Sequence, residues 1–365
     1  MLRCYDVIVI GAGPAGTTTA LMLAGSGLSV LLLEKYQLPR DKPCGGGLTP
    51  KAQRLLPVPI EDLVLNRAAS VQVRYGTGLS TSFRSKRATI WMVRRRELDQ
   101  RLAEAAARRG VEIHDGESFR SIDLGHEIQI RSTRGYYRGR VAIGADGAES
   151  RVANCLRLPR AHRWMVALET EVEVDGDPLA GEAIVDLGVP GGYGWVFPKG
   201  SSYNLGVGSF YPKTAMELRW RFDRFTTGLG FHIRDPLFPV GHRIPAGPVR
   251  GPLHRGNVLL VGDAAGVADP FFAEGISYSL LTAHLAARVV VDYLAGRSSE
   301  LSSYTSLAKA ALDKEARLWR LTAKVVHRFP ALSLRALAAS RFLQWEVERA
   351  VAGEMSFCQQ WSRPA

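Results

Sequence analysis

Cysteine and long apolar runs are both scarce in this chain. Its 365 residues include four cysteines, Cys4, Cys44, Cys155 and Cys358, and no two of them form a Cys-x-x-Cys pair. So few cysteines exclude a disulfide framework and favour a reducing compartment. No stretch reaches the roughly 18 to 20 apolar residues of a membrane-spanning helix, and the N-terminal apolar run is too short for an export signal. These absences predict a cytoplasmic protein.

Internal repeats and low-complexity linkers are also missing, so the domains must be interleaved rather than joined in series. The length allows two domains, and a hydrophobic content of 46% is ordinary for a globular protein. Strand–helix segments alternate with segments of alternating apolar and polar residues. We predict a discontinuous nucleotide-binding domain (1–66, 93–161 and 238–295), an antiparallel-sheet substrate domain (67–92 and 162–237) and a C-terminal helical region (296–365).

The chain is basic, with a formal net charge of +12. Either an acidic partner surface or a coding bias toward arginine explains this charge. No nucleic-acid-binding motif accompanies it, which argues against a nucleic-acid partner. Between Arg297 and Ala365, eleven Lys or Arg residues outnumber six Asp or Glu residues and alternate with large apolar ones. This pattern is typical of a helix docked on its own protein, or of one that touches the anionic inner surface of a membrane.

A dinucleotide-binding fingerprint opens the chain. Residues 5–10 predict a buried strand, and Gly11, Gly13 and Gly16 follow in the spacing Gly-x-Gly-x-x-Gly before a predicted helix. In this motif the first glycine permits a tight turn and the second lets backbone N–H groups approach a pyrophosphate. The third allows close packing of the helix on the strand. A second strand ends in Glu34, where a ribose-binding carboxylate is expected.

A later segment, Val258–Gly266, indicates which dinucleotide is bound, NAD or FAD. Asp263 follows a second buried strand there, and its carboxylate suits the hydroxyl of a sugar alcohol better than a nicotinamide. Gly275 and Ile276 begin a predicted helix whose first N–H groups suit a flavin carbonyl. The two segments together predict bound FAD.

Three other segments carry candidate flavin contacts. Asp146 and Gly147 follow a predicted strand and form either a cofactor-bridging motif, as in flavin hydroxylases, or an ordinary turn. Arg95, in a run of three arginines, is the candidate for contact with the flavin or its pyrophosphate. The glycines that follow Cys44 allow the chain to lie flat against a planar ligand. The Cys44 thiol either lies beside the flavin ring or fills a crowded turn.

Aromatic residues are concentrated in residues 193–231, which contain ten of them, about three times the 8% average of the chain. They are Tyr193, Trp195, Phe197, Tyr203, Phe210, Tyr211, Trp220, Phe222, Phe225 and Phe231. Either they form the core of the predicted sheet, or some of them line a long apolar cavity for a large lipophilic ligand.

These segments together resemble the geranylgeranyl reductase family of FAD-dependent oxidoreductases, within the hydroxylase-like flavoprotein superfamily. The resemblance covers about residues 1–295 and rests on GAGPAG at 11–16, KPCGGG at 42–47, GADGAESRVA at 144–153, PGGYGWVFPKG at 190–200 and GDAAGVADPFFAEGI at 262–276. Its most specific element is Pro-x-x-Tyr-x-Trp-x-Phe-Pro. Phe271 and Phe272 stand where the family commonly has smaller side chains.

The resemblance implies saturation of carbon–carbon double bonds in an isoprenoid chain on a lipid, quinone or pigment precursor. Reduced FAD would deliver a hydride to one alkene carbon, and Cys44 or a flavin-bound water would supply the proton to the other. No second complete Gly-x-Gly-x-x-Gly is present, so NADPH would dock without a domain of its own, and reduced ferredoxin is equally compatible as the donor. Two alternatives remain: a flavin monooxygenase or halogenase acting on an aromatic or polyketide substrate, and a non-catalytic lipid carrier with a relict FAD.

The predicted fold is α/β, or α+β overall, with a Rossmann-like FAD-binding domain interleaved with an antiparallel-sheet substrate domain and followed by helices. The predicted catalytic residues are Cys44, Tyr193 and Trp195, and no metal ligands are predicted. The predicted substrate contacts are Tyr193, Trp195, Phe197, Pro198, Phe271 and Phe272. The predicted FAD contacts are Gly11, Gly13, Pro14, Ala15, Gly16, Glu34, Lys35, Cys44, Gly45, Gly46, Gly47, Arg95, Phe119, Asp146, Gly262, Asp263, Pro270, Gly275 and Ile276. The expected partners are a lipophilic prenyl substrate, an electron-donor protein and the membrane surface.

Overall fold

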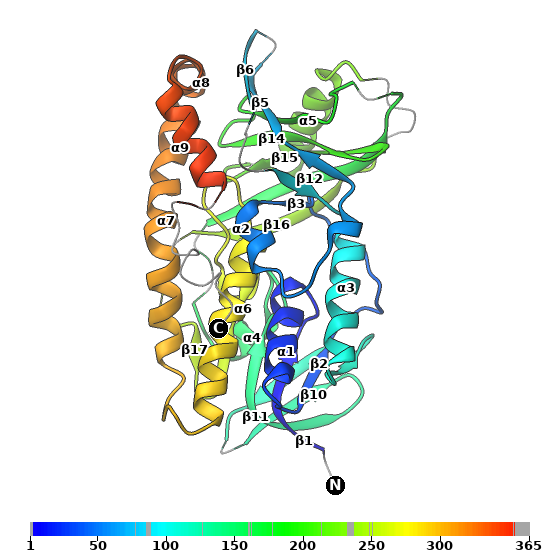
Figure 1. Cartoon of the computed structure of the whole chain (residues 1–365), viewed down its shortest axis with the longest axis vertical. Coiled ribbons are helices and arrows are strands. Elements are labelled where there is room, and N and C mark those ends of the chain that lie inside the picture. The colour runs from blue at the N-terminus through cyan, green and yellow to red at the C-terminus, as the bar shows by residue number, and fades with distance from the viewer. Residues whose placement is uncertain are drawn as a thin grey trace.

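The computed structural model describes residues 3–76, 78–84, 89–125, 127–159, 161, 163–176, 178–212, 214–231, 237–247, 249, 251–352 and 354. Two large sheets follow one another along the long axis of the molecule, and long helices run beside them (Figure 1). Cys358 lies outside the described residues.

The first sheet is built on the parallel strands that the fingerprint predicts. Its strands are β1 (Cys4–Ile10), β2 (Val30–Leu33), β8 (Glu112–His114), β9 (Phe119–Asp123), β10 (Ile128–Ser132), β11 (Tyr136–Gly144), β17 (His254–Arg255) and β18 (Val258–Leu260). The main path runs β17-β18-β11-β1-β2-β8, and β1 pairs in parallel with both β2 and β11. All of β2 is buried, as expected of a parallel strand with both faces covered.

Helices α1 (Pro14–Gly25), α3 (Arg95–Arg108) and α6 (Ile276–Leu294) lie beside this sheet, and α1 contacts both of the others. The close approach of α1 to the turn before it depends on Gly16, because an added Cβ would lie 1.9 Å from the Gly11 carbonyl oxygen. This confirms the packing role predicted for the third glycine. The shorter helical segments are α2 (Pro50–Leu55), η1 (Glu61–Leu63), α4 (Arg151–Cys155) and η2 (Gly262–Ala265).

The second sheet contains β5 (Ser70–Tyr75), β6 (Leu79–Arg84), β12 (Arg163–Glu173), β13 (Ala183–Asp186), β14 (Gly192–Lys199), β15 (Ser202–Ser209) and β16 (Val240–Ala246). Its order is β16-β12-β15-β14-β13-β5-β6. Most neighbours are antiparallel, as predicted, but β13 pairs in parallel with β5. These two strands come from separate segments, so no hairpin fixes their relative direction. Helix α5 (Ala215–Thr227) packs on β12 and β15, where Phe222 and Phe225 are buried.

The position of β16 differs from the predicted organisation. Residues 238–295 were assigned to the nucleotide-binding domain, whereas β16 pairs with β12 in the second sheet. The alternation of polar and apolar residues identifies a strand but not its partner, which is why the sequence did not show this pairing. The domain boundaries themselves remain predictions.

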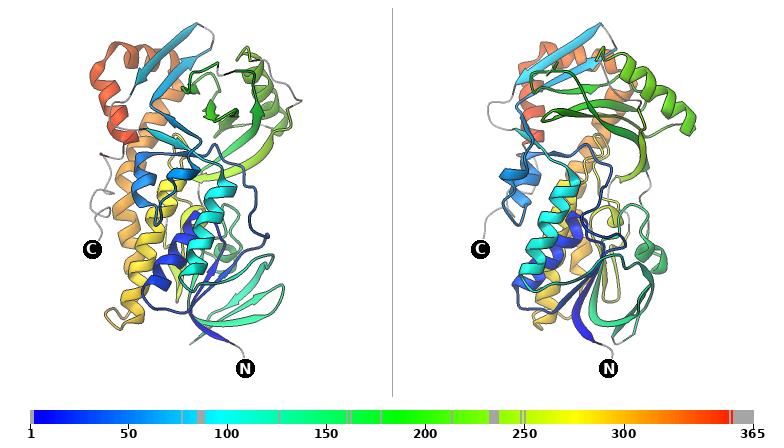
Figure 2. Two further views of the ribbon diagram at one scale, coloured as in Figure 1. Left: turned by 45° about the vertical axis from the view of Figure 1, so that its right-hand side comes forward. Right: turned by 90° about the vertical axis from the view of Figure 1, so that its right-hand side faces the viewer.

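Two smaller units connect and flank the sheets. The strands β3 (Gly47–Leu48), β4 (Asn66–Ala68) and β7 (Ile90–Met92) form a three-stranded sheet between the two large ones. The C-terminal region is helical, as predicted, with α7 (Ser303–Arg328), α8 (Pro330–Ala339) and α9 (Arg341–Val351). Helix α7 runs along the side of the molecule, and α8 and α9 lie at the end farther from the N-terminus (Figure 2).

In the described part of the chain, no helix is both long enough and apolar enough to cross a membrane.

Helix α7 is fixed to the first sheet by Tyr304. This side chain is fully buried, and its hydroxyl donates to the Leu260 carbonyl oxygen at 2.7 Å. We expect Tyr304→Phe to lower the free energy of unfolding by about 1–3 kcal/mol, because a buried carbonyl loses its partner. Tyr293→Phe is the matched control, since Tyr293 is half-buried and its hydroxyl bonds Asn257 over 3.4 Å. Urea unfolding of both variants checks this, and equal effects would contradict it.

Candidate active site

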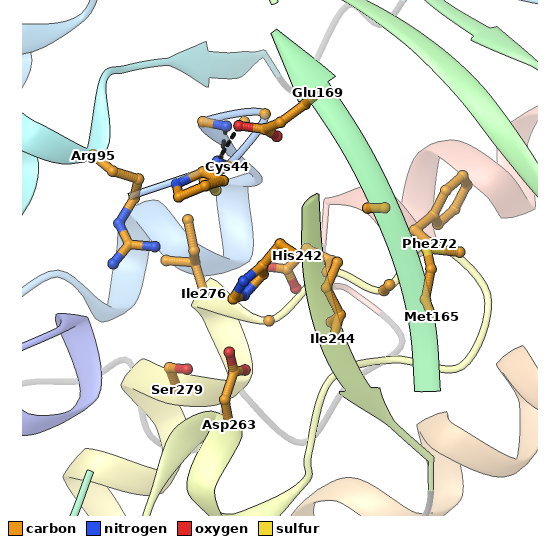
Figure 3. A pocket seen from close by; sticks show the side chains of 18 of the residues that line it. Cys44, Arg95, Met165, Glu169, His242, Ile244, Asp263, Phe272, Ile276 and Ser279 are labelled. Carbon is orange, nitrogen blue, oxygen red and sulfur yellow. Dashed lines mark hydrogen bonds between the residues drawn. The ribbon is translucent and has the colours of Figure 1, made fainter. Parts of the chain in front are cut away.

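A cavity of about 1770 Å³ extends from the fingerprint turn to the second sheet and on to helices α7–α9. Figure 3 shows the part of it where the two sheets meet. There Arg95, His242, Asp263 and Ile276 come from four different elements and point toward a shared space. Segments far apart in the sequence therefore build one site.

The fingerprint turn forms one end of this cavity. Gly13 is the N-cap of α1, and no side chain caps the helix, so its first N–H groups are open to an anion. An added Cβ at Gly13 would lie 3.9 Å from Nη2 of both Arg40 and Arg95. Two guanidinium groups thus flank the N-terminus of the helix, an arrangement suited to a pyrophosphate.

Carboxylates hold these two arginines in place. Arg95 donates through Nε and Nη2 to the two oxygens of Asp99, at 2.9 Å and 2.8 Å. Burial lowers the pKa of Arg95, but the Asp99 carboxylate raises it more, and the net shift is upward. Arg40 lies 3.1 Å from Asp99 and 3.5 Å from Glu34. Its buried Nε and Nη1 have no hydrogen-bond acceptor among the described residues. An oxygen-rich ligand would satisfy these donors.

Glu34 directly follows β2, at the same end of the cavity. Its Oε2 accepts from the Ala12 N–H at 2.8 Å and its Oε1 from the Tyr36 N–H at 3.1 Å. Each carboxylate oxygen has a second lone pair, so Glu34 can still accept from a ribose hydroxyl.

Asp263 faces the cavity on the far side of the fingerprint turn. Burial raises its pKa, and the charges of Lys42 and Arg95 offset this only in part. Its Oδ1 lies 3.2 Å from the position of an added Cβ at Gly275, the N-cap of α6. The residues therefore fit a flavin dinucleotide: Gly13, Arg40 and Arg95 suit its pyrophosphate, Glu34 its ribose, and Asp263 a polyol hydroxyl.

Cys44 lies where the two sheets meet, and both its backbone N–H and its carbonyl are hydrogen-bonded to side chains. Its N–H donates to Glu169 Oε1 of β12 at 2.5 Å (Figure 3), and its carbonyl accepts from Lys199 Nζ of β14 at 3.4 Å. Burial raises the pKa of Glu169, and Lys199 opposes that shift. Both backbone polar groups of this segment are thus held by side chains of the second sheet.

The glycines after Cys44 leave room for neighbouring protein groups. An added Cβ at Gly45 would lie 2.9 Å from the Phe197 ring, and one at Gly46 would lie 2.0 Å from the Val93 carbonyl oxygen. Gly46 also has a φ of +73°, which favours glycine. This packing explains the glycine run without a ligand. Contact of the run with a flavin remains a prediction.

Lys42 and His242 form a pair on the cavity wall, with Nζ of the lysine 3.1 Å from Nε2 of the histidine. Burial, with the nearby charges of Lys42 and Arg95, lowers the pKa of His242 from 6.5 to about 3. The imidazole is therefore neutral near pH 7 and accepts from the ammonium group. Burial, with the charge of Arg95, also lowers the pKa of Lys42, which makes this lysine a better proton donor than an exposed one.

Three aromatic rings of β14 face the cavity, because Tyr193, Trp195 and Phe197 alternate along one face of the strand. The Tyr193 hydroxyl donates to the Phe272 carbonyl oxygen at 2.5 Å, and Trp195 Nε1 donates to Asn204 Oδ1 at 2.7 Å. The polar atoms of Tyr193 and Trp195 are thus paired within the protein, and their apolar ring atoms contribute to the cavity lining. The aromatic segment is thus divided: Tyr193, Trp195 and Phe197 line the cavity, whereas Tyr203, Phe210, Phe222 and Phe225 belong to the core. A lipophilic ligand for the cavity remains a prediction.

Helix α7 completes this aromatic wall. Trp319 stacks on Phe271 with a centroid distance of 5.8 Å and meets Phe272 edge-on at 5.6 Å. Phe272 in turn meets Tyr193 edge-on at 5.9 Å. The two phenylalanines that depart from the family pattern are therefore packed between β14 and the C-terminal helices.

Most of the predicted site residues line the cavity. They are Gly11, Gly13, Pro14, Ala15, Glu34, Lys35, Cys44, Gly45, Gly46, Gly47, Arg95, Phe119, Asp146, Tyr193, Trp195, Phe197, Asp263, Phe271, Phe272, Gly275 and Ile276. The Asp146 carboxylate also caps α4, accepting from the Arg151 N–H at 2.7 Å and the Val152 N–H at 3.1 Å.

Four predicted residues lie outside the cavity lining: Gly16, Pro198, Gly262 and Pro270. Gly16 packs α1 on its own turn, and an added Cβ at Gly262 would lie 2.8 Å from Ala15 Cβ. Pro198 follows Phe197 in β14 and so points to the opposite face of the sheet. Pro270 is buried in the loop before α6.

Sequence reasoning missed Arg40, Lys42, Glu169, His242 and Trp319, all of which line the cavity. Glu169 carried a usable signal, because it shares a strand face with the buried Met165 and Ala167, where an apolar residue is expected. The others carried none, since each acts through residues distant in the chain.

Comparisons with known proteins agree with this site. The model of the FAD binding domain family matches residues 4–185. A geranylgeranyl diphosphate reductase of Rhodobacter capsulatus is 31% identical over 323 residues, which cover 85% of this chain and 80% of the relative. A menaquinone reductase of Mycobacterium tuberculosis is also 31% identical, covering 78% of this chain and 76% of the relative.

Solved structures show the same fold. A geranylgeranyl bacteriochlorophyll reductase-like protein of Thermoplasma acidophilum aligns with a TM-score of 0.85 at 22% identity, covering 97% of each chain. A flavin-dependent brominase aligns with a TM-score of 0.75 at 20% identity, covering 98% of this chain and 96% of the brominase. Together with the relatives that share 31% of their residues, these matches show that the chain belongs to the geranylgeranyl reductase family of FAD-dependent oxidoreductases.

Proposed function

We propose that this protein saturates carbon–carbon double bonds of an isoprenoid chain carried by a lipid, quinone or pigment precursor. One observation carries the proposal: a single cavity joins the dinucleotide cradle to an apolar arm. The cradle is the N-terminus of α1 with Gly13, Arg40 and Arg95, and the arm is the part of the cavity that extends to the C-terminal helices. The names of the relatives support it. Besides the two already described, a digeranylgeranylglycerophospholipid reductase of Methanocaldococcus jannaschii is 27% identical over 293 residues.

The arm beyond the aromatic wall suits a long hydrocarbon. Strands β4 to β6 and β13 supply Ala68, Val71, Val73, Phe83, Ala183 and Val185 to its lining. Helices α7 to α9 supply Val326, Leu334, Leu337, Val347 and Val351. Such a lining recognises length and apolar area rather than a polar pattern, as an isoprenoid tail requires.

Bound FAD, once reduced, would supply hydride chemistry. Gly13, Arg40 and Arg95 would hold its pyrophosphate, Glu34 its ribose and Asp263 a polyol hydroxyl. We call the part of the cavity where the two sheets meet the chamber; it is lined by Lys42, Cys44, His242, Tyr193, Trp195 and Phe272. The three aromatic rings shape it and would exclude water from it. NADPH or reduced ferredoxin is the proposed electron donor, and the basic surface suits either of them.

When a hydride adds to one carbon of the double bond, the other carbon needs a proton. Two groups that line the chamber carry one. The sequence predicts either Cys44, whose side chain lines the chamber, or a flavin-bound water as the donor. The Lys42 ammonium, held by the neutral imidazole of His242, is the second, and its lowered pKa favours proton transfer. We favour Lys42, because the pair with His242 gives the ammonium a defined direction.

We expect the reduced, FAD-loaded protein to reoxidise under anaerobic conditions when geranylgeranyl diphosphate or a prenylquinone is added. The product should gain one H₂ for each double bond saturated. Flavin absorbance and product mass measure the two effects in one reaction. If the flavin stays reduced with every prenyl acceptor and reacts only with oxygen and an aromatic substrate, the protein is a monooxygenase instead.

We expect Lys42→Met to slow single-turnover reoxidation by roughly 100-fold or more. A proton donor is lost as pH rises through its pKa, so the wild-type rate should fall at a pH below 10.5, the ordinary value of a lysine. The variant should lose this alkaline decline while keeping its FAD content. Cys44→Ser is the comparison: if it removes the decline and Lys42→Met does not, the thiol is the donor.

A further inference from the structure

The C-terminal helices carry an unusual share of the exposed apolar side chains. Eighteen large hydrophobic residues are exposed in the described part of the chain, and eight of them fall between residues 318 and 345. They are Leu318, Leu321, Val325, Phe329, Leu332, Phe342, Leu343 and Trp345. Leu332 and Phe342 are 65% and 64% exposed, so nothing in the described chain covers them.

The charge in the same stretch is entirely positive. Between Arg317 and Trp345 the sequence has six basic residues and no Asp or Glu. The six are Arg317, Arg320, Lys324, Arg328, Arg335 and Arg341. Among the described residues, none of these six pairs with a carboxylate. We call these fourteen residues the basic apolar surface.

The cavity opens on this surface. Leu321, Val325 and Leu343 are 62%, 51% and 39% exposed, and all three also line the cavity. Val347 and Val351 continue the lining inward from Leu343 along α9. The apolar arm therefore reaches the exterior between α7 and α9, at the end away from the fingerprint turn.

We propose that the basic apolar surface docks on an anionic lipid bilayer, and that the isoprenoid chain enters the cavity directly from that bilayer between α7 and α9. The route of entry rests on the proposed function, whereas the docking does not. Helices that combine exposed aromatic and aliphatic side chains with basic ones lie in the interface of anionic membranes. A chain that passes between Leu321 and Leu343 meets a lining that is mostly apolar, with Thr322, Ser333 and Glu348 as its polar members.

A second copy of this chain fits the surface less well. Most homodimers are two-fold symmetric, so the same patch would face itself. Six unpaired cations would then meet six more, which opposes association. A bilayer surface supplies the missing negative charge.

Flotation of the FAD-loaded, full-length protein with vesicles tests the docking. We expect binding to vesicles of phosphatidylcholine with half phosphatidylglycerol, and little binding to phosphatidylcholine alone. The variant R328Q/R335Q/R341Q should lower the partition coefficient roughly 100-fold, at about fivefold per charge. The variant F342S/W345S should also lower it without any change of charge.

The matched control is R120Q/R131Q/R134Q, which removes three exposed arginines from the opposite end of the molecule, around β9 and β10 (Figure 1). It should bind like the wild type, although its net charge equals that of the first variant. Thermal unfolding and FAD content show that each variant is folded. Equal losses in both arginine variants, or none in either, would overturn the proposal. So would a dimer in light scattering that F342S/W345S dissociates.

Turnover separates this proposal from the proposed function. R328Q/R335Q/R341Q should reduce a detergent-dispersed prenyl substrate at the wild-type rate and lose turnover of the same substrate embedded in vesicles. An equal rate on both substrates would overturn the route of entry. Vesicle binding by a wild-type protein that reduces no prenyl substrate would refute the proposed function and leave the docking surface standing.

Discussion

The two-sided grip on the Cys44 backbone is the constraint on which the site depends. Glu169 accepts from the Cys44 N–H, and Lys199 donates to the Cys44 carbonyl. Side chains of the second sheet therefore hold the loop that follows β2 of the first sheet. Gly45 then packs against Phe197, and Gly46 against the Val93 carbonyl. Because these distances leave no space for a Cβ, glycine at these two positions allows the Cys44 segment to pack against Phe197 of β14 and the Val93 carbonyl. The grip thus sets where the aromatic face of β14 lies relative to the dinucleotide cradle.

At the N-terminus of α1, the carboxylates beside Arg40 and Arg95 do not use all the donors of these two guanidinium groups. Arg40 and Arg95 share the Asp99 carboxylate, and Glu34 gives two of its lone pairs to backbone N–H groups. Burying these ions costs free energy unless each is paired. Arg40 retains buried donors without acceptors, so the protein alone leaves part of that cost uncompensated. A bound pyrophosphate would offset it and would thereby link the binding of the dinucleotide to the stability of the fold.

The sequence predicted what local patterns determine. The fingerprint turn, α1 and Glu34 follow from glycine spacing and strand length, and the structure has them as expected. The pairing of β16 with β12 and the contact of Lys42 with His242 join residues that local patterns do not relate. The concentration of aromatic residues in 193–231 did not say whether the strand face that carries Tyr193, Trp195 and Phe197 met a core or a cavity. Only the packing of Trp319 and Phe271 around it decides that question.

The C-terminal helices carry no motif of the family, yet α7 belongs to both the chamber and the surface. Its Trp319 stacks on Phe271 beside the aromatic wall, while Leu321, two residues further, is 62% exposed. The helix is anchored by Tyr304 at one end and by Glu315, which accepts from Lys51 and Tyr278, nearer the chamber. A rigid α7 therefore sets a fixed distance between the chamber and the mouth of the cavity. For a hydrocarbon drawn in from that mouth, as proposed, this distance would determine which double bonds reach the chamber, so a segment outside the family motifs would govern which part of a substrate reacts.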